Sequence, residues 1–437
     1  MNSNEIYVSL DIGTSSVKVI IGEMVNDTLN IIGVGNVKSE GIKKGSIVDI
    51  DETVRSIQKA VEQAERMIGM DIKQVVVGIS GNHVMLQPCH GVVAVSSENK
   101  EITENDVIRV REAAELITIP SDREIIDIVP IHYKVDELDE ISDPRGMIGV
   151  RLEMRGVLIT GLRTILHNSL RCVERAGLEI TDIALQPLAA GSLVLSKDEK
   201  ELGVAMVDIG GGSTTLAVFE QGHLKYTSVI PVGGETITKD LSIVLRTTTE
   251  NAENIKVQHG HAFYEDASTE ETFQIPIIGS DQMQPCNQSF LSEIIEARMT
   301  EIFDLVQDEL EKIGFQDIPG GFVLTGGGVK MPGVLELAQD IFRNRVRTAE
   351  PNYIGVREPQ YTTAVGLIKH VCKKERMKKN QSDSSKTPVT AGQAQENHEV
   401  RAQKQNQKPK EQPVKKQADK SEKGESKFKK ILGYFFE

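Results

Sequence analysis

The residues best suited to chemistry lie in two short segments that resemble each other. D-I-G-T-S-S-V-K occupies residues 11–18, and D-I-G-G-G-S-T-T-L occupies residues 208–216. Each segment follows one run of β-branched residues and leads into a second, and a turn and a third β run come next. This repeat of strand, turn, strand, turn, strand, with its copies about two hundred residues apart, predicts two similar subdomains that face one another.

The turn in each segment has the composition of a phosphate-binding loop. Glycine lets backbone N–H groups approach an anion without a Cβ in the way, hydroxyls add donors, and a lysine adds positive charge. The acidic residue before each turn is suited to anchor a hydrated Mg²⁺ that bridges phosphates. A tight hairpin without a ligand is the alternative for either copy alone, but two copies in matching contexts favour the phosphate site. The predicted groups are Asp11, Gly13, Thr14, Ser15, Ser16 and Lys18 in the first loop and Asp208, Gly210, Gly211, Gly212, Ser213 and Thr214 in the second.

A third glycine segment, F-V-L-T-G-G-G-V-K-M-P-G, occupies residues 322–333. Gly326, Gly327 and Gly328 would let the main chain pass flat under a ring such as adenine. We expect a helix to begin near Pro332, with its N-terminus turned toward the phosphates. An ordinary strand-to-helix turn is the alternative for this motif.

The elements that must position these loops belong to an α/β protein up to about residue 372. Short β runs alternate with amphipathic stretches, and the segment 51–68 predicts a helix that ends at Gly69. One face of this helix is apolar and consists of Val54, Ile57, Val61, Ala64 and Ile68. The four cysteines, Cys89, Cys172, Cys286 and Cys372, are too far apart for a metal site and predict reduced, mostly buried thiols.

The charge is unevenly distributed along the chain. The formal net charge is −14, but residues 373–437 contain 17 Lys and Arg against 9 Asp and Glu, so residues 1–372 carry −22. An acidic body of this kind argues against a nucleic-acid partner. The N-terminus lacks a secretory signal and no run is long enough to span a bilayer, so we expect the chain to stay in the cytoplasm.

The end of the chain differs from the rest in composition. Residues 379–425 are polar, with almost no large apolar side chains, which predicts a disordered linker. Residues 426–437 predict an amphipathic helix that lies in an anionic membrane surface; docking on the body or on another protein is the alternative. Its apolar face contains Phe428, Ile431, Leu432, Phe435 and Phe436, flanked by Lys427 and Lys429.

The three glycine motifs, in this order and spacing, resemble the phosphate 1, phosphate 2 and adenosine motifs of the actin, Hsp70 and sugar-kinase superfamily. Within it the chain resembles the FtsA family of bacterial cell-division proteins. That closer resemblance rests on G-I-K-K-G-S-I-V-D-I-D-E-T-V at residues 41–54, on the segment between about residues 83 and 161, and on the linker with its terminal helix. It implies ATP with Mg²⁺ as cofactor, actin-like filaments of the protein itself, and binding of the C-terminal peptide of the tubulin-like protein FtsZ.

The resemblance also implies the architecture. The expected fold is an actin-like ATPase fold, with two facing subdomain pairs around a nucleotide cleft, a 1C-type insertion, a disordered linker and the terminal helix. The expected boundaries are 1–82, 163–203 and 351–372 for subdomain 1A; 83–162 for 1C, a candidate docking site for further division proteins; 204–232 and 304–350 for 2A; and 233–303 for 2B. Within 2B the stretch 266–285 has the composition of a loop.

Four further residues are identified from the resemblance. Gln186 occupies a position where the superfamily has a Gln or Glu that helps to position the attacking water, which makes it, with Asp208, the candidate catalytic residue. Glu253 and Lys256 would lie beside the ribose and adenine; an exposed i, i+3 ion pair is the alternative. Arg298 is the candidate contact for the FtsZ peptide, with a solvated helix charge as the alternative.

These features favour a scaffold over an enzyme. A sugar kinase would need a further catalytic acid in a matching motif, and an Hsp70-type chaperone would need a peptide-binding domain after the ATPase. A pilus-assembly ATP-binding protein would not be expected to have the terminal helix. We therefore expect a protein that hydrolyses ATP slowly at most, and that tethers FtsZ filaments to the cytoplasmic side of the cell membrane at the division septum.

Overall fold

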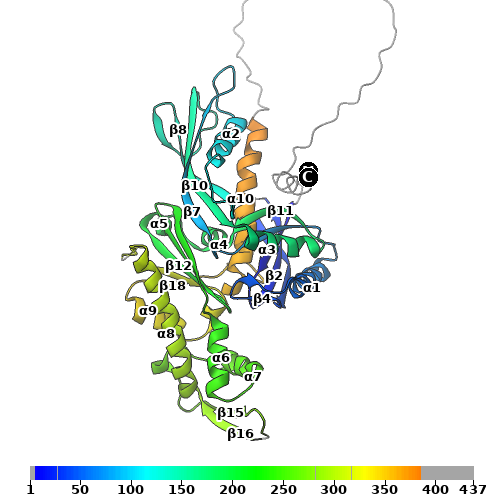
Figure 1. The fold of residues 1–437 in the computed structure, drawn as a ribbon, viewed down its shortest axis with the longest axis vertical. Helices are drawn as coiled ribbons and strands as arrows, with labels where there is room; N and C mark the ends of the chain where they lie inside the picture. Colours follow the sequence, from blue (N-terminus) through cyan, green and yellow to red (C-terminus); the bar gives the residue numbers. More distant parts are fainter. Residues whose placement is uncertain (1–4, 27, 281, 316, 385–437) are drawn as a thin grey trace, which may run out of the picture. The chain divides into compact units, whose positions relative to one another are not determined.

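Two five-stranded sheets of the same topology form the centre of the molecule. The computed structural model describes residues 5–26, 28–280, 282–315 and 317–384 (Figure 1). The first sheet has the order β3-β2-β1-β6-β11 and the second the order β14-β13-β12-β17-β18, so their strands correspond one to one. The strands are β1 Glu5–Ile12, β2 Ser16–Val25, β3 Thr28–Lys38, β6 Gln74–Ile79, β11 Glu179–Leu185, β12 Val204–Ile209, β13 Thr214–Glu220, β14 His223–Ile230, β17 Phe322–Thr325 and β18 Val346–Thr348.

The register of the two sheets is also equivalent. In both, the first strand is antiparallel to the second and parallel to a later strand, β6 or β17. Asp11 lies opposite Lys18 in the first hairpin, and Asp208 lies opposite Thr215 in the second. The predicted repeat is thus present as two copies of one sheet, each with its acidic residue near the end of the first strand.

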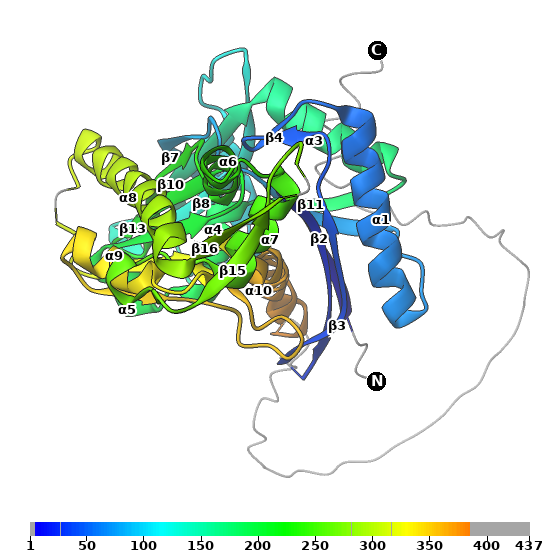
Figure 2. The ribbon, with the colours of Figure 1, turned by 90° about the horizontal axis from the view of Figure 1, so that it is seen from below.

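Helices cover both faces of the first sheet. Figure 2 shows α1 (Ile50–Ile68) on one side of β2 and β3 and α10 (Thr362–Ser384) on the other. Asp49 caps α1 by accepting the Glu52 N–H, and Gly69 ends it in the left-handed conformation. Helix α1 packs so closely on β3 that a Cβ at Gly35 would lie 2.0 Å from the Ala60 carbonyl oxygen. The remaining helices of this half are α3 Arg163–Arg175 and α4 Gln186–Val194, whereas α5 Lys197–Leu202 packs on β13 of the second sheet.

The predicted apolar face of α1 is confirmed. Val54, Ile57, Val61 and Ala64 are buried. Helix α10 runs to Ser384, past residue 379 where the linker is predicted to begin. The rest of that linker and the whole terminal segment 426–437, with its predicted membrane face, lie outside the described residues.

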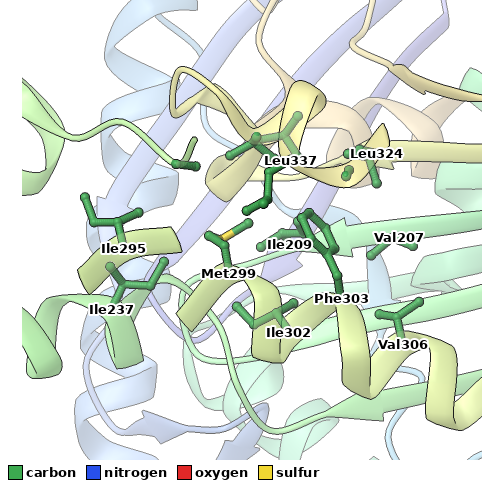
Figure 3. Close-up of a cluster of buried hydrophobic side chains, with 14 of the residues drawn as sticks. Val207, Ile209, Ile237, Ile295, Met299, Ile302, Phe303, Val306, Leu324 and Leu337 are labelled. Atoms are coloured by element: carbon green, nitrogen blue, oxygen red, sulfur yellow. The ribbon is translucent and has the colours of Figure 1, made fainter. Parts of the chain in front are cut away.

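The second sheet packs on a long helix, α8 (Gln288–Lys312). Met299, Ile302, Phe303 and Val306 of α8 meet apolar side chains of β12 and β17 (Figure 3). Three other helices belong to this half: α6 Gly234–Val244, α7 Thr249–His259 and α9 Val334–Phe342. The loop-like reading of 266–285 is wrong in part, because β15 (Thr272–Pro276) and β16 (Met283–Asn287) form a hairpin there. Ile275 and Cys286 of that hairpin are buried in the α8 core.

A separate four-stranded sheet is inserted between β6 and β11. Its order is β7-β10-β8-β9, and α2 (Glu104–Glu115) packs on β7 and β10. Arg123 is buried where the insertion joins the body, and its guanidinium donates to the Thr160 hydroxyl at 3.0 Å and to the His83 carbonyl at 2.7 Å. One side chain thus ties the entry and the exit of the insertion together. The strands are β7 Met85–Ala94, β8 Arg123–Val135, β9 Leu138–Ile141 and β10 Arg151–Leu162.

Two predictions concern membrane spans and thiols. Among the described helices, none has the length and apolar content that a membrane span requires. The four cysteines are buried and none forms a disulfide, as the sequence predicts.

Candidate nucleotide site

The two predicted phosphate loops have the same backbone conformation. The Gly13 N–H donates to the Ser16 carbonyl at 3.1 Å, and the Gly210 N–H donates to the Ser213 carbonyl at 3.0 Å. A Cβ at either glycine would lie 2.9 Å from the oxygen that its own N–H contacts. Both positions therefore require glycine for the same reason, a close backbone approach within the loop.

The two loops are in contact with each other. A Cβ at Gly212 would lie 2.3 Å from Cγ2 of Thr14, and one at Gly211 would lie within 2 Å of the Ser15 hydroxyl. Within the part of the chain that the structure describes, no hydrogen bond occupies the N–H groups of Gly211 and Gly212. Two N–H groups free of protein partners in a glycine turn are the donors that an anion site needs.

Two carboxylates lie beneath the loops, near the ends of β1 and β12. Asp11 accepts a hydrogen bond from the Gln186 amide at 2.7 Å, and its other oxygen lies 3.5 Å from the Lys18 ammonium. Asp208 accepts a hydrogen bond from the Thr363 hydroxyl at 3.3 Å. Thr363 belongs to the first turn of α10, so a helix from the end of the folded chain completes the site.

The charge between these carboxylates is incompletely balanced. The pKa of Asp208 is raised to about 6, chiefly by burial and then by the negative charge of Asp11, although Lys18 and the Thr363 hydroxyl lower it in part. A cation placed between the two carboxylates would remove that penalty. The donor set therefore fits a hydrated Mg²⁺, which takes one or two carboxylates and keeps most of its waters.

The third glycine motif reaches the same site. Gly326 has a positive φ of 92°, and a Cβ there would lie 2.2 Å from Oδ1 of Asp208. Gly327 and Gly328 begin a 3-10 turn, Gly327–Lys330, rather than a helix. Helix α9 then starts at Val334 after Gly333, two residues beyond the predicted start at Pro332. All three motifs thus lie around Asp208, although their contact with a nucleotide stays a prediction.

The predicted pair Glu253 and Lys256 lies on α7, where Lys256 packs against the start of α6 beside the second loop. The Lys256 ammonium donates to Glu253 at 2.7 Å, to the Thr238 hydroxyl at 2.7 Å and to the Gly234 carbonyl at 3.1 Å. The pair is indeed i, i+3, and the alternative of an exposed pair is wrong for Lys256, which is buried, but not for the Glu253 side chain, which is 47% exposed. The next residues of α6 donate backbone N–H groups to the second loop, Gly234 to Gly210 and Glu235 to Gly211. Two consecutive hydrogen bonds, from Lys256 to Gly234 and from Gly234 to Gly210, therefore connect the lysine with a phosphate loop.

Two predicted residues have other partners than expected. Thr214 is fully buried and donates its hydroxyl to the Val232 carbonyl at 2.9 Å, so the prediction that it binds phosphate is wrong. Arg298 lies on α8, away from these loops, and pairs with Asp240 at 2.6 Å and with Glu301. Its side chain is 26% exposed, so it is more enclosed than a solvated helix charge.

Three residues of the site were not predicted from the sequence. Thr363 contacts Asp208, Glu235 accepts from the Ser15 hydroxyl at 2.6 Å, and the Gly45 N–H donates to the Thr14 hydroxyl at 2.9 Å. Each comes from an element far along the chain from the loop that it contacts. For Thr363, the sequence offered one local signal of a polar contact, the pair of threonines Thr362 and Thr363 at the start of a helix.

Comparison with known proteins places the chain in a family. Models described as "Cell division protein FtsA" and "SHS2 domain inserted in FTSA" match residues 205–366 and 81–160. FtsA of Bacillus subtilis (strain 168) is 62% identical over 377 residues, which cover 86% of each chain. The chain belongs to the FtsA family of cell division proteins. FtsA of Enterococcus hirae is 47% identical over 368 residues, 84% of this chain and 83% of that relative, and the resemblance inferred from the motifs is confirmed.

Solved structures share the fold at low sequence identity. The PilM–PilN type IV pilus biogenesis complex matches with a TM-score of 0.58 and 17% identity, over 83% of this chain and 98% of that one. MreB5 of Spiroplasma citri bound to ADP matches with a TM-score of 0.53 and 15% identity, over 87% and 99%. The predicted actin-like ATPase fold with an inserted domain, here an SHS2 domain, is confirmed.

The raised pKa of Asp208 makes stability depend on pH. Between its ordinary pKa near 4 and the folded value of about 6, the folded state retains a proton that the unfolded state has released, so stability falls as pH rises. Asp208→Asn should remove this loss and raise the free energy of unfolding at pH 7.5 by up to about 3 kcal/mol, with little change at pH 4. Urea unfolding of the ligand-free protein at both pH values measures it. Exposed Asp340→Asn is the matched control, and an equal effect of Asp208→Asn at both pH values would contradict the assignment.

Proposed function

We propose that this protein is a cell-division scaffold. Its folded part up to about residue 372, here called the head, binds ATP and self-associates into actin-like filaments, and its terminal segment, residues 426–437, holds FtsZ filaments at the membrane. The observation that carries the proposal is the pair of equivalent glycine loops in contact above Asp11 and Asp208, in a chain of the FtsA family. The terminal segment adds the amphipathic pattern of a membrane anchor. The site of action is the cytoplasmic side of the cell membrane at the division septum.

In the proposed nucleotide complex, the two loops hold the phosphates from opposite sides. Mg²⁺, when bound, would neutralise phosphate charge between Asp11 and Asp208. Backbone N–H groups of Gly211 and Gly212 donate to phosphate oxygens, and Gly326 and Gly328 border the adenosine. The side chains of Glu253 and Lys256 lie nearest the ribose. Closure of the two loops on one ligand would hold the two halves of the head together.

Hydrolysis is expected to be slow. Gln186 donates its amide to Asp11 at 2.7 Å, and a carboxamide cannot accept a proton as a general base at neutral pH. Its contribution would be to orient a water beside the metal-binding carboxylate. Nucleotide occupancy rather than turnover is then the quantity that sets the polymerising state.

Two other functions fit less well. A pilus-assembly role has only the shared fold in its favour, at 17% identity, while the sequence relatives are division proteins. A sugar-kinase role would need a carboxylate free to act as a base on a substrate hydroxyl. Asp11 already pairs with Lys18 and Gln186, and its negative charge raises the pKa of Asp208. Two neighbouring carboxylates of this kind suit metal binding better than general-base catalysis.

The FtsZ peptide is proposed to dock on α8 and the elements beside it. Arg298 lies there, with its guanidinium held in place by Asp240 and Glu301. Tyr264 and Phe290 in the same half are 42% and 45% exposed, and the Tyr264 N–H is tied to Glu296 of α8. Aromatic side chains and arginine are both enriched at the centres of protein-binding surfaces.

Removal of the arginine tests this docking site. Arg298→Ala should weaken binding of the FtsZ C-terminal peptide by about tenfold or more, since a hot-spot arginine contributes over 1 kcal/mol. Fluorescence anisotropy with a labelled peptide measures the affinity. Lys312→Ala, on the same helix with a 65% exposed side chain, is the control and should bind as the wild type does. If the two variants bind the peptide equally, α8 is not the docking site at Arg298.

The terminal segment is proposed to be a reversible membrane anchor. A segment of about twelve residues is too short to be a stable helix in water, so it should fold on the bilayer. Five apolar side chains at about 1.5 to 3 kcal/mol each set an upper limit, from which ordering and partial immersion subtract. Many tails on one filament would convert later binding events into intramolecular ones and hold far more tightly.

Sedimentation with anionic liposomes tests the anchor. Deletion of residues 426–437, or Phe435→Glu with Phe436→Glu, should reduce the bound fraction to the level seen without liposomes, because the apolar face is lost. Lys420→Gln in the linker is the control for charge alone. Unchanged liposome binding by the deletion variant would show that the head or another segment makes the contact.

A further inference from the structure

A short β-hairpin beside the phosphate loops is not explained by the three glycine motifs. Strands β4 (Ile42–Lys43) and β5 (Ser46–Ile47) pair antiparallel, with Lys43 opposite Ser46. The two residues at its tip, Lys44 and Gly45, have φ values of 50° and 75°. Turns with two positive φ values favour Gly, Asn and Asp, so a lysine at the first of them is an uncommon choice. Such a choice at a ligand site points to a role for the side chain.

The hairpin is anchored at its base, so its tip has a fixed position. The Gly41 carbonyl accepts N–H groups from Val48 at 2.8 Å and Asp49 at 3.0 Å. Asp49 is also the N-cap of α1, and Ile42 is buried. The hairpin is therefore a continuation of the α1 end rather than a loose loop.

The tip contacts both phosphate loops. The Gly45 N–H donates to the Thr14 hydroxyl at 2.9 Å, which belongs to the first loop. A Cβ at Gly45 would lie 3.9 Å from the hydroxyl of Ser213, in the second loop, and 3.9 Å from that of Ser80, after β6. Gly45 therefore lies close to both loops, and its positive φ of 75°, rather than a lack of space, favours glycine here.

The lysines of the hairpin differ from the other lysines of the site. Lys18 and Lys256 already have carboxylate partners, Asp11 at 3.5 Å and Glu253 at 2.7 Å. Lys43 and Lys44 are exposed, and no ion pair to either occurs within the described ranges. A triphosphate brings more negative charge than a diphosphate, and the hairpin supplies the cations that can compensate it.

We propose that the tip Lys43-Lys44-Gly45 is a third phosphate-binding element, which contacts the terminal phosphate of a bound nucleoside triphosphate. The inference rests on the proposed nucleotide function and makes it specific. The first two loops hold the phosphates that ATP and ADP share, and the hairpin distinguishes the two nucleotides. Because the hairpin continues into α1, it links the presence of that phosphate to the position of this helix.

The test compares ATP and ADP affinity in a hairpin variant. In Lys43→Gln/Lys44→Asn, asparagine tolerates the positive φ of residue 44, so the backbone is kept while both charges are removed. Titration of fluorescent ATP and ADP analogues in Mg²⁺ should show ATP affinity about tenfold or more lower and ADP affinity within about twofold of the wild type. Lys59→Gln, on the exposed face of α1, is the matched control.

The outcomes separate the inference from the function on which it rests. An unchanged ratio of ATP to ADP affinity would overturn the inference alone, whether neither affinity changes or both fall by the same factor. Failure of the wild-type protein to bind either nucleotide would overturn the proposed function and the inference together. The ADP affinity, with thermal unfolding of the ligand-free variant, shows that the double variant is folded.

Discussion

The rest of the structure depends on two carboxylates that are held near each other without a full complement of positive charge. Asp11 and Asp208 lie near the ends of equivalent strands, and the Lys18 ammonium lies 3.5 Å from Asp11. The pKa of Asp208 is raised by burial and by the charge of Asp11. The ligand-free protein has an electrostatic cost at this point, which a bound cation would relieve. The glycine loops and the start of α10 are arranged around that point.

The two sheets place the carboxylates, and other elements connect the site to the rest of the molecule. Helix α6 donates its first N–H groups to the second loop and carries Glu235, which contacts Ser15 of the first. A change in loop separation would therefore move α6, and with it the half of the head that contains α8. On the other side, Arg123 fixes the SHS2 insertion to the body, so this insertion follows any movement of the first half. Such rigid coupling is what allows a ligand to alter surfaces distant from its own contacts.

The sequence predicted those parts of the molecule that depend on local pattern. The repeated strand-turn-strand segments, the glycine turns and the buried face of α1 all follow from residue type and spacing within one element. The superfamily followed from the three glycine motifs, and the FtsA family from residues 41–54, the segment 83–161 and the linker with its terminal helix. Parts that depend on contacts between distant segments were not predicted. Thr363, Glu235 and the hairpin tip at Gly45 reach the loops only through the tertiary fold.

The errors have the same origin. Thr214 has the right type for a phosphate donor, but its hydroxyl is turned to the Val232 carbonyl, which no local pattern reveals. For Lys256 the alternative of an exposed ion pair fails because α6 packs against its side chain, which the i, i+3 spacing does not reveal. The hairpin β15–β16 was missed because its polar composition resembles a loop, although its own Ile275 and Cys286 are buried. Burial of a few residues, rather than average composition, decides such cases.

The central claim, that the paired carboxylates form a cation-dependent nucleotide site, is tested most directly by the effect of Mg²⁺ on ATP affinity. Titration of a fluorescent ATP analogue should give an affinity at least about tenfold higher in Mg²⁺ than in EDTA, because the cation offsets the charge of Asp11 and Asp208. The same titration of Asp208→Asn should show most of that difference lost. Equal affinity in Mg²⁺ and in EDTA for the wild-type protein would contradict the account.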